Sequence, residues 1–290
     1  MENSPTLAVI GGSGLYQMAG LTKIQEHDLE TPFGKPSAPV ITGYLEGELV
    51  AFLARHGLGH HLSPSEVNYR ANIFALKMLG VVRILSISAC GSLREDFAPG
   101  DVVIPDQIFD FTRDRKRTFF EDHCVAHISV ADPFCPQLSE LTSQAVASTG
   151  MNLHRGGSLI TIEGPRFSTK AESQTFRAWG MSVIGMTASP EVFLAREAEM
   201  CYCTMAHVTD YDVWHVSEEP VTVEIVIEIL LKNTAHAQKA VHALTKDLPK
   251  DRDCTCGQAL ASALITDPKV IPPETHKRLG LLINKYMKAG

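Results

Sequence analysis

The sequence predicts an α/β protein, in which helices flank a mixed β-sheet and a helical extension follows at the C-terminus. Short apolar runs rich in β-branched residues alternate along the chain with longer segments whose apolar residues recur at helical spacing. No internal repeat or low-complexity segment interrupts this alternation. Strands that alternate with helices form a mostly parallel or mixed sheet that is covered on both faces.

Five apolar runs in the first part of the chain are predicted strands, and they span residues 7–10, 40–44, 49–54, 81–89 and 101–109. The second and third of these form a hairpin, because Glu46-Gly47 supplies a turn between them. Residues 66–79 carry the helical pattern, with Ser65 as the expected N-cap and Gly80 as the end of the helix.

Helices and strands alternate through the rest of the chain, with helices at residues 136–150, 169–180, 189–199 and 220–246 and strands at residues 158–162, 182–186 and 200–208. The last of these helices is long and amphipathic. Residues 247–253 are polar and loop-like, and the chain beyond them has room for one or two helices. We therefore expect an α/β domain at residues 1–250 and a helical extension, packed on it, at residues 251–290.

Composition and charge exclude several classes of protein. The 290 residues carry a formal net charge of −7 and no basic stripe with interleaved aromatics, so a nucleic acid is not an expected partner. No apolar run reaches the roughly 18 residues that a membrane span needs, and Met1-Glu2-Asn3-Ser4-Pro5 lacks the pattern of a signal peptide. We expect a cytoplasmic protein that does not bind membranes.

Seven cysteines, an odd number that lies partly in apolar segments, indicate reduced thiols rather than a disulfide framework. Cys201 and Cys203 lie within a predicted strand and are expected to fill the core. Cys254 and Cys256 lie in a polar turn, where a strained disulfide, a metal site and free thiols are the alternatives. Zinc sites usually space their cysteines by two to four residues, so free thiols are favoured.

Three histidines, His56, His60 and His61, lie close together in the sequence. Their neighbourhood supplies no acidic ligand beyond Glu66, so they do not predict a metal site, and none is predicted elsewhere in the chain. A serine-hydrolase elbow of the form Gly-x-Ser-x-Gly is absent from the sequence.

Asp210 and Asp212 directly follow the apolar run at residues 200–208. Ligands in open α/β sheets bind beyond the carboxyl ends of strands, and residues two apart in an extended chain point the same way. Two close carboxylates resist double ionisation, so one keeps its proton to higher pH. Such a pair can donate one hydrogen bond and accept another, which suits N7 and the 6-amino group of adenine. The alternatives are an acidic surface turn and the N-cap of a helix.

Polar residues also lie at or just past the ends of other predicted strands, at Ser13, Arg55, Ser88 and Thr187. Arginine offers a planar fork that suits phosphate, and His56 can add a donor, although an Arg-His pair at a strand end is often solvated surface. The cluster Gly11-Gly12-Ser13-Gly14 fits neither the dinucleotide fingerprint nor a P-loop, and a structural tight turn is its alternative. Together these residues predict an anion pocket of modest charge, suited to an exchangeable phosphate.

A loop at residues 161–168 joins a predicted strand to a predicted helix and contains Phe167. This aromatic ring could stack on a flat base, or it could belong to the core. The same loop contains Glu163 and Arg166, which could pair with each other and fix its conformation.

Six segments occur together and in order: Thr31-Pro32-Phe33-Gly34-Lys35-Pro36-Ser37, Arg55-His56-Gly57, Glu66-Val67-Asn68-Tyr69-Arg70-Ala71-Asn72, Ala89-Cys90-Gly91-Ser92-Leu93, residues 161–167, and Thr209-Asp210-Tyr211-Asp212. In these segments the chain resembles the methylthioadenosine phosphorylases of the trimeric purine nucleoside phosphorylase group, over roughly residues 6–245. The resemblance implies a nucleoside phosphorylase catalytic domain at residues 1–250. It implies that phosphate attacks the anomeric carbon of 5′-methylthioadenosine, giving adenine and 5-methylthioribose 1-phosphate. It further implies a homo-oligomer, a trimer or a dimer of trimers, with no cofactor besides the co-substrate phosphate.

The resemblance also implies a role for individual residues. The phosphate pocket would comprise Ser13, Arg55, His56, Ser88, the N–H of Ala89, and Thr187, while the nucleoside would meet Phe167, Ser168, Met186, Asp210, Asp212, Val223, Val226 and His127. Asp210 would act at adenine N7 and Asp212 at the 6-amino side. His127 would come from a neighbouring subunit and shape the alkylthio pocket with the two valines. The chain departs from the family at Ile87-Ser88, where a threonine pair is common.

Other functions compete with this one. A 6-oxopurine nucleoside phosphorylase or a methylthioinosine phosphorylase binds a base with an acceptor at position 6, for which a donor such as asparagine would serve better than Asp212. A non-catalytic purine- or phosphate-binding protein on the same fold is the alternative from another class, since a fold does not fix a function.

Overall fold

The computed structural model describes residues 4–12, 18–215 and 222–287, and of residues 225, 226 and 228–233 it describes the backbone alone. Its sheet has eleven strands within these ranges: β1 (Leu7–Gly11), β2 (Thr22–His27), β3 (Val40–Leu45), β4 (Glu48–Ala54), β5 (Arg83–Ser92), β6 (Val102–Ile104), β7 (Gln107–Phe111), β8 (Leu153–Arg155), β9 (Ser158–Ile162), β10 (Val183–Gly185) and β11 (Cys201–Asp210). The helices in the same part of the chain are α1 (Tyr69–Met78), α2 (Pro136–Ala147), α3 (Lys170–Ala178), α4 (Ala188–Glu197), α5 (Val223–Asp247) and α6 (Pro273–Ile283), with short 3₁₀ helices η1 (Thr255–Gln258) and η2 (Pro268–Val270). The predicted α/β class is confirmed.

The sheet is mixed, and β5 is its central strand. The main order is β2-β3-β4-β1-β5-β10-β9-β7, while β11 pairs with both β5 and β6, and β8 pairs with β6. Strand β1 runs parallel to β4 and β5, and β11 runs parallel to β5 from Cys201 opposite Arg83 to Val208 opposite Cys90. The carboxyl ends of β1, β4, β5 and β11 therefore meet at one edge of the sheet.

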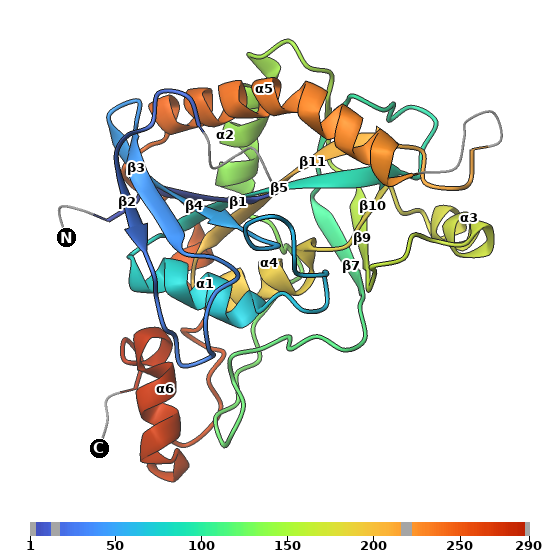
Figure 1. Cartoon of the computed structure of the whole chain (residues 1–290). Coiled ribbons are helices and arrows are strands. Elements are labelled where there is room, and N and C mark those ends of the chain that lie inside the picture. Colours follow the sequence, from blue (N-terminus) through green and yellow to red (C-terminus); the bar gives the residue numbers. More distant parts are fainter. Residues whose placement is uncertain (1–3, 13–17, 216–221, 288–290) are drawn as a thin grey trace.

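Helices cover both faces of the sheet (Figure 1). On one face α2 and α5 pack against an apolar cluster that includes Leu7 and Leu85, and on the other α1 and α4 pack against a cluster that includes Ile10 and Ile84. Neighbouring residues of β1 and β5 thus point to opposite faces, as the period of two in a strand requires. Such strands read as continuous apolar runs because both faces are buried.

Several element boundaries differ from the prediction. The hairpin turn is correct, because Glu46 and Gly47 both adopt positive φ, 51° and 86°, between β3 and β4. Helix α1 begins at Tyr69 rather than at residue 66, because the Asn68 side chain accepts the N–H of Ala71 and serves as the N-cap. Ser65 instead donates its hydroxyl proton to the side chain of Glu163.

The structure contains two strands that were not predicted, and one predicted strand corresponds to two separate strands. Strand β2 has the sequence Thr-Lys-Ile-Gln-Glu-His and is exposed at the edge of the sheet, so it lacks an apolar pattern. Strand β8 spans only three residues. The predicted strand at residues 101–109 is interrupted at Pro105-Asp106, which separates β6 from β7. Proline has no N–H to donate to a sheet ladder.

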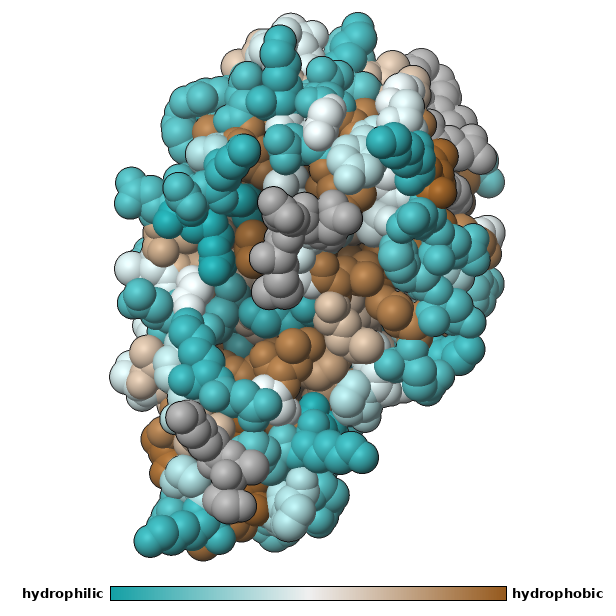
Figure 2. Space-filling view, turned by 90° about the vertical axis from the view of Figure 1, so that its left-hand side faces the viewer, coloured by the Kyte–Doolittle hydropathy of each residue, from teal (hydrophilic) through white to brown (hydrophobic). Residues whose placement is uncertain are grey.

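The C-terminal segment packs on the lower side of the domain in Figure 1, where α6 lies at the end of the molecule opposite α5. Leu279, Leu282 and Ile283 of α6 are buried in the same apolar cluster as α1 and α4. Figure 2 shows hydrophilic side chains over much of one face, with hydrophobic ones gathered near its centre and around this lower part. Among the described residues, no helix combines the length and apolar character needed to cross a membrane.

Candidate active site

A cleft of about 630 Å³ opens at the edge where β1, β4, β5 and β11 end. The predicted site residues that line it are Arg55, His56, Ser88, Ala89, Phe167, Ser168, Met186, Thr187, Asp210, Asp212 and Val223. Ser13 lies outside the described residues, as does the side chain of Val226 in α5. His127 is exposed and is not among the described residues that line the cleft; its N–H donates to the carbonyl of Ala263.

One end of the cleft is lined by hydroxyl groups. The alternation of β5 turns Ser88 toward the cleft, where its Oγ lies 3.2 Å from Oγ1 of Thr187. Thr187 occupies the N-cap position of α4, yet its hydroxyl makes no capping hydrogen bond. A Cβ on Gly12 would meet nothing within 4 Å, so the backbone there is open to a ligand. This end can donate several hydrogen bonds to an anion.

Arg55 is fully buried at this end and bonds to protein groups with most of its guanidinium. Its Nε and Nη2 donate to the two carboxylate oxygens of Glu191 at 2.8 and 3.0 Å, and Nη2 also donates to Ser86 Oγ at 2.7 Å. Its Nη1 donates to the Ile87 carbonyl at 3.2 Å, which leaves one N–H for a ligand. Burial alone would lower the pKa of Arg55, but the Glu191 carboxylate raises it. The solvated-surface alternative for Arg55 is wrong.

His56 is neutral and acts as an acceptor toward the cleft. Burial, with the neighbouring Arg55 charge, lowers its pKa to about 4. Its Nδ1 lies 2.9 Å from the Leu62 carbonyl, which only accepts, so Nδ1 carries the proton and Nε2 carries a lone pair. Its ring stacks on His60 with centroids 4.3 Å apart. The expectation that His56 adds a donor therefore changes: Nε2 of the neutral ring can accept a hydrogen bond from a ligand hydroxyl.

The two carboxylates share the opposite end of the cleft, although the chain does not stay extended through them. Strand β11 ends at Asp210, and Asp212 adopts a left-handed conformation with φ of 51°. The turn is closed by the Asp212 N–H, which donates to Asp210 Oδ1 at 2.7 Å, and the Thr209 hydroxyl donates to Oδ2 at 2.6 Å. Both aspartates are largely buried, so an acidic surface turn is wrong.

Burial sets the protonation of this pair. It raises the pKa of Asp210, despite the hydrogen bonds from Thr209 and from the Asp212 N–H, which lower it. Burial also raises the pKa of Asp212. The nearby hydroxyls of Ser173 and Ser168 lower that pKa, and the neighbouring charge of Asp210 raises it. A buried carboxyl group with a raised pKa beside a second one is the arrangement expected of an acid in catalysis.

Within the part of the chain that the structure describes, several buried polar atoms in and beside the cleft lack partners, and two of them belong to predicted site residues. Asp212 Oδ2 and Ser168 Oγ are buried, and neither has a hydrogen-bond partner among the described residues. A buried polar group without a partner costs about 1–3 kcal/mol. Since both residues line the cleft, a bound ligand can satisfy them. Asp212 Oδ2 accepts hydrogen bonds when ionised, so the ligand should present an N–H or O–H group to it.

The wall between the two ends is apolar and partly open to solvent. It includes Phe167, Met186, Val223 and Ile227. Phe167 is 36% exposed, Ile227 51% and Val223 57%. Phe167 therefore does not belong to the core, and its ring is available at the cleft.

Arg115 organises the loops around the cleft, a role that its neighbours in the sequence do not predict. Its guanidinium is buried and donates to the carbonyls of Met186 and Ser189, each at 2.7 Å, and to that of Glu163 at 2.6 Å. Glu163 accepts from Arg115, while Arg166 pairs with Glu172, so a Glu163–Arg166 pair is wrong. Arg115 lies in a run of charged residues, 113–117, that reads as solvated surface.

Comparisons with known proteins find close relatives along nearly the whole chain. The family described as the phosphorylase superfamily matches residues 6–248. A protein named S-methyl-5′-thioadenosine phosphorylase from Koribacter versatilis is 50% identical and covers 98% of both chains. One of the same name from Geobacter sulfurreducens is 50% identical and covers 97% of this chain and 99% of its own. A crystal structure of a methylthioadenosine phosphorylase from an antarctic soil metagenomic library has a TM-score of 0.91 at 45% identity, covering 97% of this chain and 99% of that one.

Proposed function

The chain belongs to the phosphorylase superfamily, and we infer from this that it is a pentosyltransferase that cleaves 5′-methylthioadenosine with inorganic phosphate. The products are adenine and 5-methylthioribose 1-phosphate. Relatives named S-methyl-5′-thioadenosine phosphorylase, at about 50% identity over nearly the full length, support this reaction. Within the site, the observation that best supports this reaction is the buried Oδ2 of Asp212, which has no hydrogen-bond partner among the residues described and lies beside Asp210. We propose that phosphate is the co-substrate and that no other cofactor takes part.

Asp210 is the proposed general acid. As the C1′–N9 bond breaks, its electron pair moves onto adenine, and the sugar acquires oxocarbenium character. A proton transferred from Asp210 to N7 lets the base leave neutral. The Thr209 hydroxyl and the Asp212 N–H then hold the carboxylate that remains. The raised pKa of Asp210 keeps that proton available at higher pH than an exposed aspartate would.

The hydroxyl-lined end is the proposed phosphate site. Ser88, Thr187 and the remaining N–H of Arg55 Nη1 supply donors, with the backbone at Gly12 and Ala89. His56 Nε2 would accept a hydrogen bond from the hydroxyl group of monohydrogen phosphate. A positioned anion both attacks C1′ and stabilises the positive charge that develops there.

Adenine release is expected to depend on phosphate. In the presence of phosphate, purified protein should convert 5′-methylthioadenosine to adenine and a phosphorylated sugar in equal amounts. A hydrolase would release adenine at the same rate in phosphate-free buffer. Chromatography of both products with and without phosphate distinguishes the two, and equal turnover without phosphate would contradict the proposed reaction.

Asp212→Asn is expected to weaken the preference for 6-amino over 6-oxo nucleosides. The asparagine amide can donate to a 6-oxo group, which the carboxylate cannot. The measurement is the ratio of kcat/KM for 5′-methylthioadenosine and 5′-methylthioinosine in the wild type and the variant. Ser168→Ala serves as the matched control, because it removes another unpartnered atom of the cleft without reversing donor and acceptor. An unchanged ratio in Asp212→Asn would place the base elsewhere.

We further propose a cytoplasmic homo-oligomer, a trimer or a dimer of trimers, in which His127 completes the neighbour's cleft. All seven cysteines, each within the described residues, are free thiols, which a reducing compartment maintains. Val223 and Ile227 leave an exposed apolar rim at the cleft, and a subunit interface would remove it from water. His127 is exposed and away from its own cleft, where a neighbour can reach it.

Mixing two inactive variants is expected to restore activity. His127→Ala and Asp210→Ala subunits, denatured together and refolded, should form some sites with both residues intact. Activity of the mixture above that of either variant alone, with the mass confirmed by light scattering, supports a shared site. A fully active monomer, or verified mixed oligomers with no recovery, would contradict it.

A further inference from the structure

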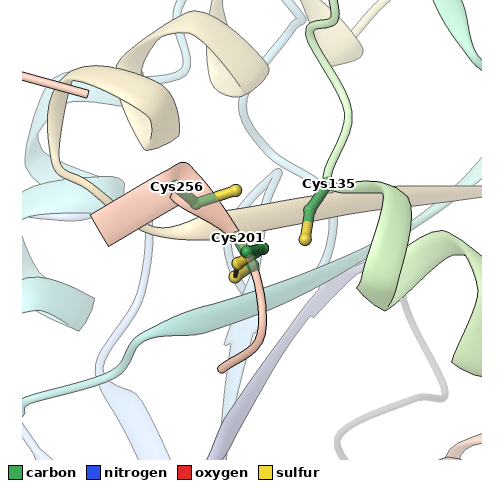
Figure 3. Close-up of side chains that lie close together, drawn as sticks. Cys135, Cys201 and Cys256 are labelled. Atoms are coloured by element: carbon green, nitrogen blue, oxygen red, sulfur yellow. Dashed lines mark hydrogen bonds between the residues drawn. The ribbon is translucent and has the colours of Figure 1, made fainter. Parts of the chain in front are cut away.

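Four cysteine sulfurs meet at the end of the molecule opposite the cleft. The Sγ atoms of Cys135, Cys201, Cys254 and Cys256 all lie within 4.8 Å of one another, and those of Cys201 and Cys254 are 3.4 Å apart. Figure 3 shows three of these side chains converging from different parts of the chain. Cys135 is the N-cap of α2, Cys201 begins β11, and the Cys254–Cys256 pair begins η1. Cys201 is buried in the core, as expected, and it is also a member of this cluster.

The spacing of these sulfurs suits a tetrahedral metal ion. Zinc binds thiolates at about 2.3 Å, which places the four sulfurs of a tetrahedron about 3.8 Å apart. The Cys201–Cys254 spacing is 3.4 Å and all the others are at most 4.8 Å, so the four sulfurs are close enough together to surround one ion. In the sequence, the short Cys254-x-Cys256 spacing argues against a zinc site. That spacing concerns only two of the four possible zinc ligands.

Hydrogen-bond donors and guanidinium groups lie around the sulfurs. Arg196 Nη1 donates to Cys256 Sγ at 3.4 Å, and the Leu138 N–H, at the positive end of α2, donates to Cys135 Sγ at 3.5 Å. Arg83 lies beside Cys201 in the sheet and donates to the carbonyls of Pro249 and Asp251, each at 2.8 Å. Zinc with four thiolates carries two negative charges, which these guanidinium groups offset.

We propose that Cys135, Cys201, Cys254 and Cys256 form a structural zinc site. Four protein ligands leave no open position for substrate. Cys201 and Asp210 begin and end β11, which at about 3.3 Å per residue separates the site from the acid by about 30 Å. The zinc would fasten the segment around η1 to α2 and β11. Its binding displaces the thiol protons, so zinc affinity should fall as the pH falls.

Zinc content measures this proposal directly. Protein purified under reductant in metal-free buffer, then given zinc and desalted, should hold about one zinc ion per chain. Cobalt in its place should give the intense visible absorption of a tetrahedral thiolate complex. Four thiols should react with a thiol reagent only after a chelator removes the metal. A wild type that holds no zinc and exposes these thiols without chelator overturns the site.

Variants separate this cluster from the other cysteines. Cys254→Ser and Cys256→Ser should reduce zinc per chain at least tenfold and lower Tm, with kcat/KM at 25 °C nearly unchanged. Cys203→Ser is the matched control, because Cys203 is buried on the same strand but is not part of the cluster. It should retain the metal. Wild-type zinc content in Cys256→Ser, or a mass two units low from a disulfide in zinc-treated wild type, would overturn the proposal.

Discussion

Asp210→Ala is expected to lower kcat for 5′-methylthioadenosine by about 10²–10⁴-fold, the contribution of a positioned general acid. Asp212→Ala should lower kcat far less, because Asp212 is proposed to select the base and not to donate the proton. The measurement is steady-state turnover at saturating phosphate. Equal and small losses in both variants would show that neither carboxyl group is the acid.

Asp210→Asn separates proton transfer from hydrogen bonding. Its amide can donate to N7 but cannot transfer a proton, so it should keep nucleoside binding and lose turnover. In the wild type, turnover should fall as the pH rises through the raised pKa of Asp210, because the protonated form is the active one. The Asn variant should lose that dependence. The same alkaline loss in both proteins would assign the proton to another group.

Glu191→Ala is expected to lower the free energy of unfolding by about 3–5 kcal/mol, because it leaves the Arg55 charge buried without a partner. Arg55 and Glu191 are 2% and 0% exposed, and Tyr202 also donates to Glu191 at 2.7 Å. Without the carboxylate, only neutral acceptors such as Ser86 Oγ and the Ile87 carbonyl hold the Arg55 guanidinium. Its position should then be less fixed, so KM for phosphate should rise as well. Urea denaturation and phosphate saturation curves measure the two effects.

Asp96→Ala is the matched control for that experiment. Arg94 and Asp96 also form a two-pronged pair, but their side chains are 46% and 60% exposed. Exposed ion pairs contribute at most about 1 kcal/mol. Similar losses of stability in the two variants would mean that burial of the Arg55–Glu191 pair does not matter.

The fold was largely predictable because its inner strands are apolar and separated by clear turns. Strands such as β5 and β11 are buried on both faces and read as continuous apolar runs. Strand β2 could not be predicted, since a polar edge strand has no apolar pattern. Helix α1 starts later than expected because its cap depends on Asn68, and nothing in the sequence ranks Asn68 above Ser65.

Site residues could be predicted where the signal is local in the sequence, and not where it depends on contacts between distant segments. Thr187 and Asp210 were found because each lies at or just past the end of a strand, and strand ends share an edge of the sheet. Ser88 was found near the predicted end of its strand, although β5 continues to Ser92. Glu191 was missed because its partner Arg55 lies 136 residues away. Arg115 was missed because its charged neighbours resemble solvated surface, and only tertiary contacts bury it. The cysteine cluster escaped notice for a similar reason, as three separate segments supply it.

The burial of α6 bears on how far the chain can be shortened. The family match ends at residue 248, but Leu279, Leu282 and Ile283 share one apolar cluster with β1 and α1. Burying each such side chain stabilises the fold by about 1.5–3 kcal/mol, and a typical domain has only about 5–15 kcal/mol in total. A chain cut after residue 250 would lose stability on that scale and expose the apolar surface that α6 covers, so it should aggregate. We therefore expect the smallest unit able to fold alone to extend beyond the residues that the family matches.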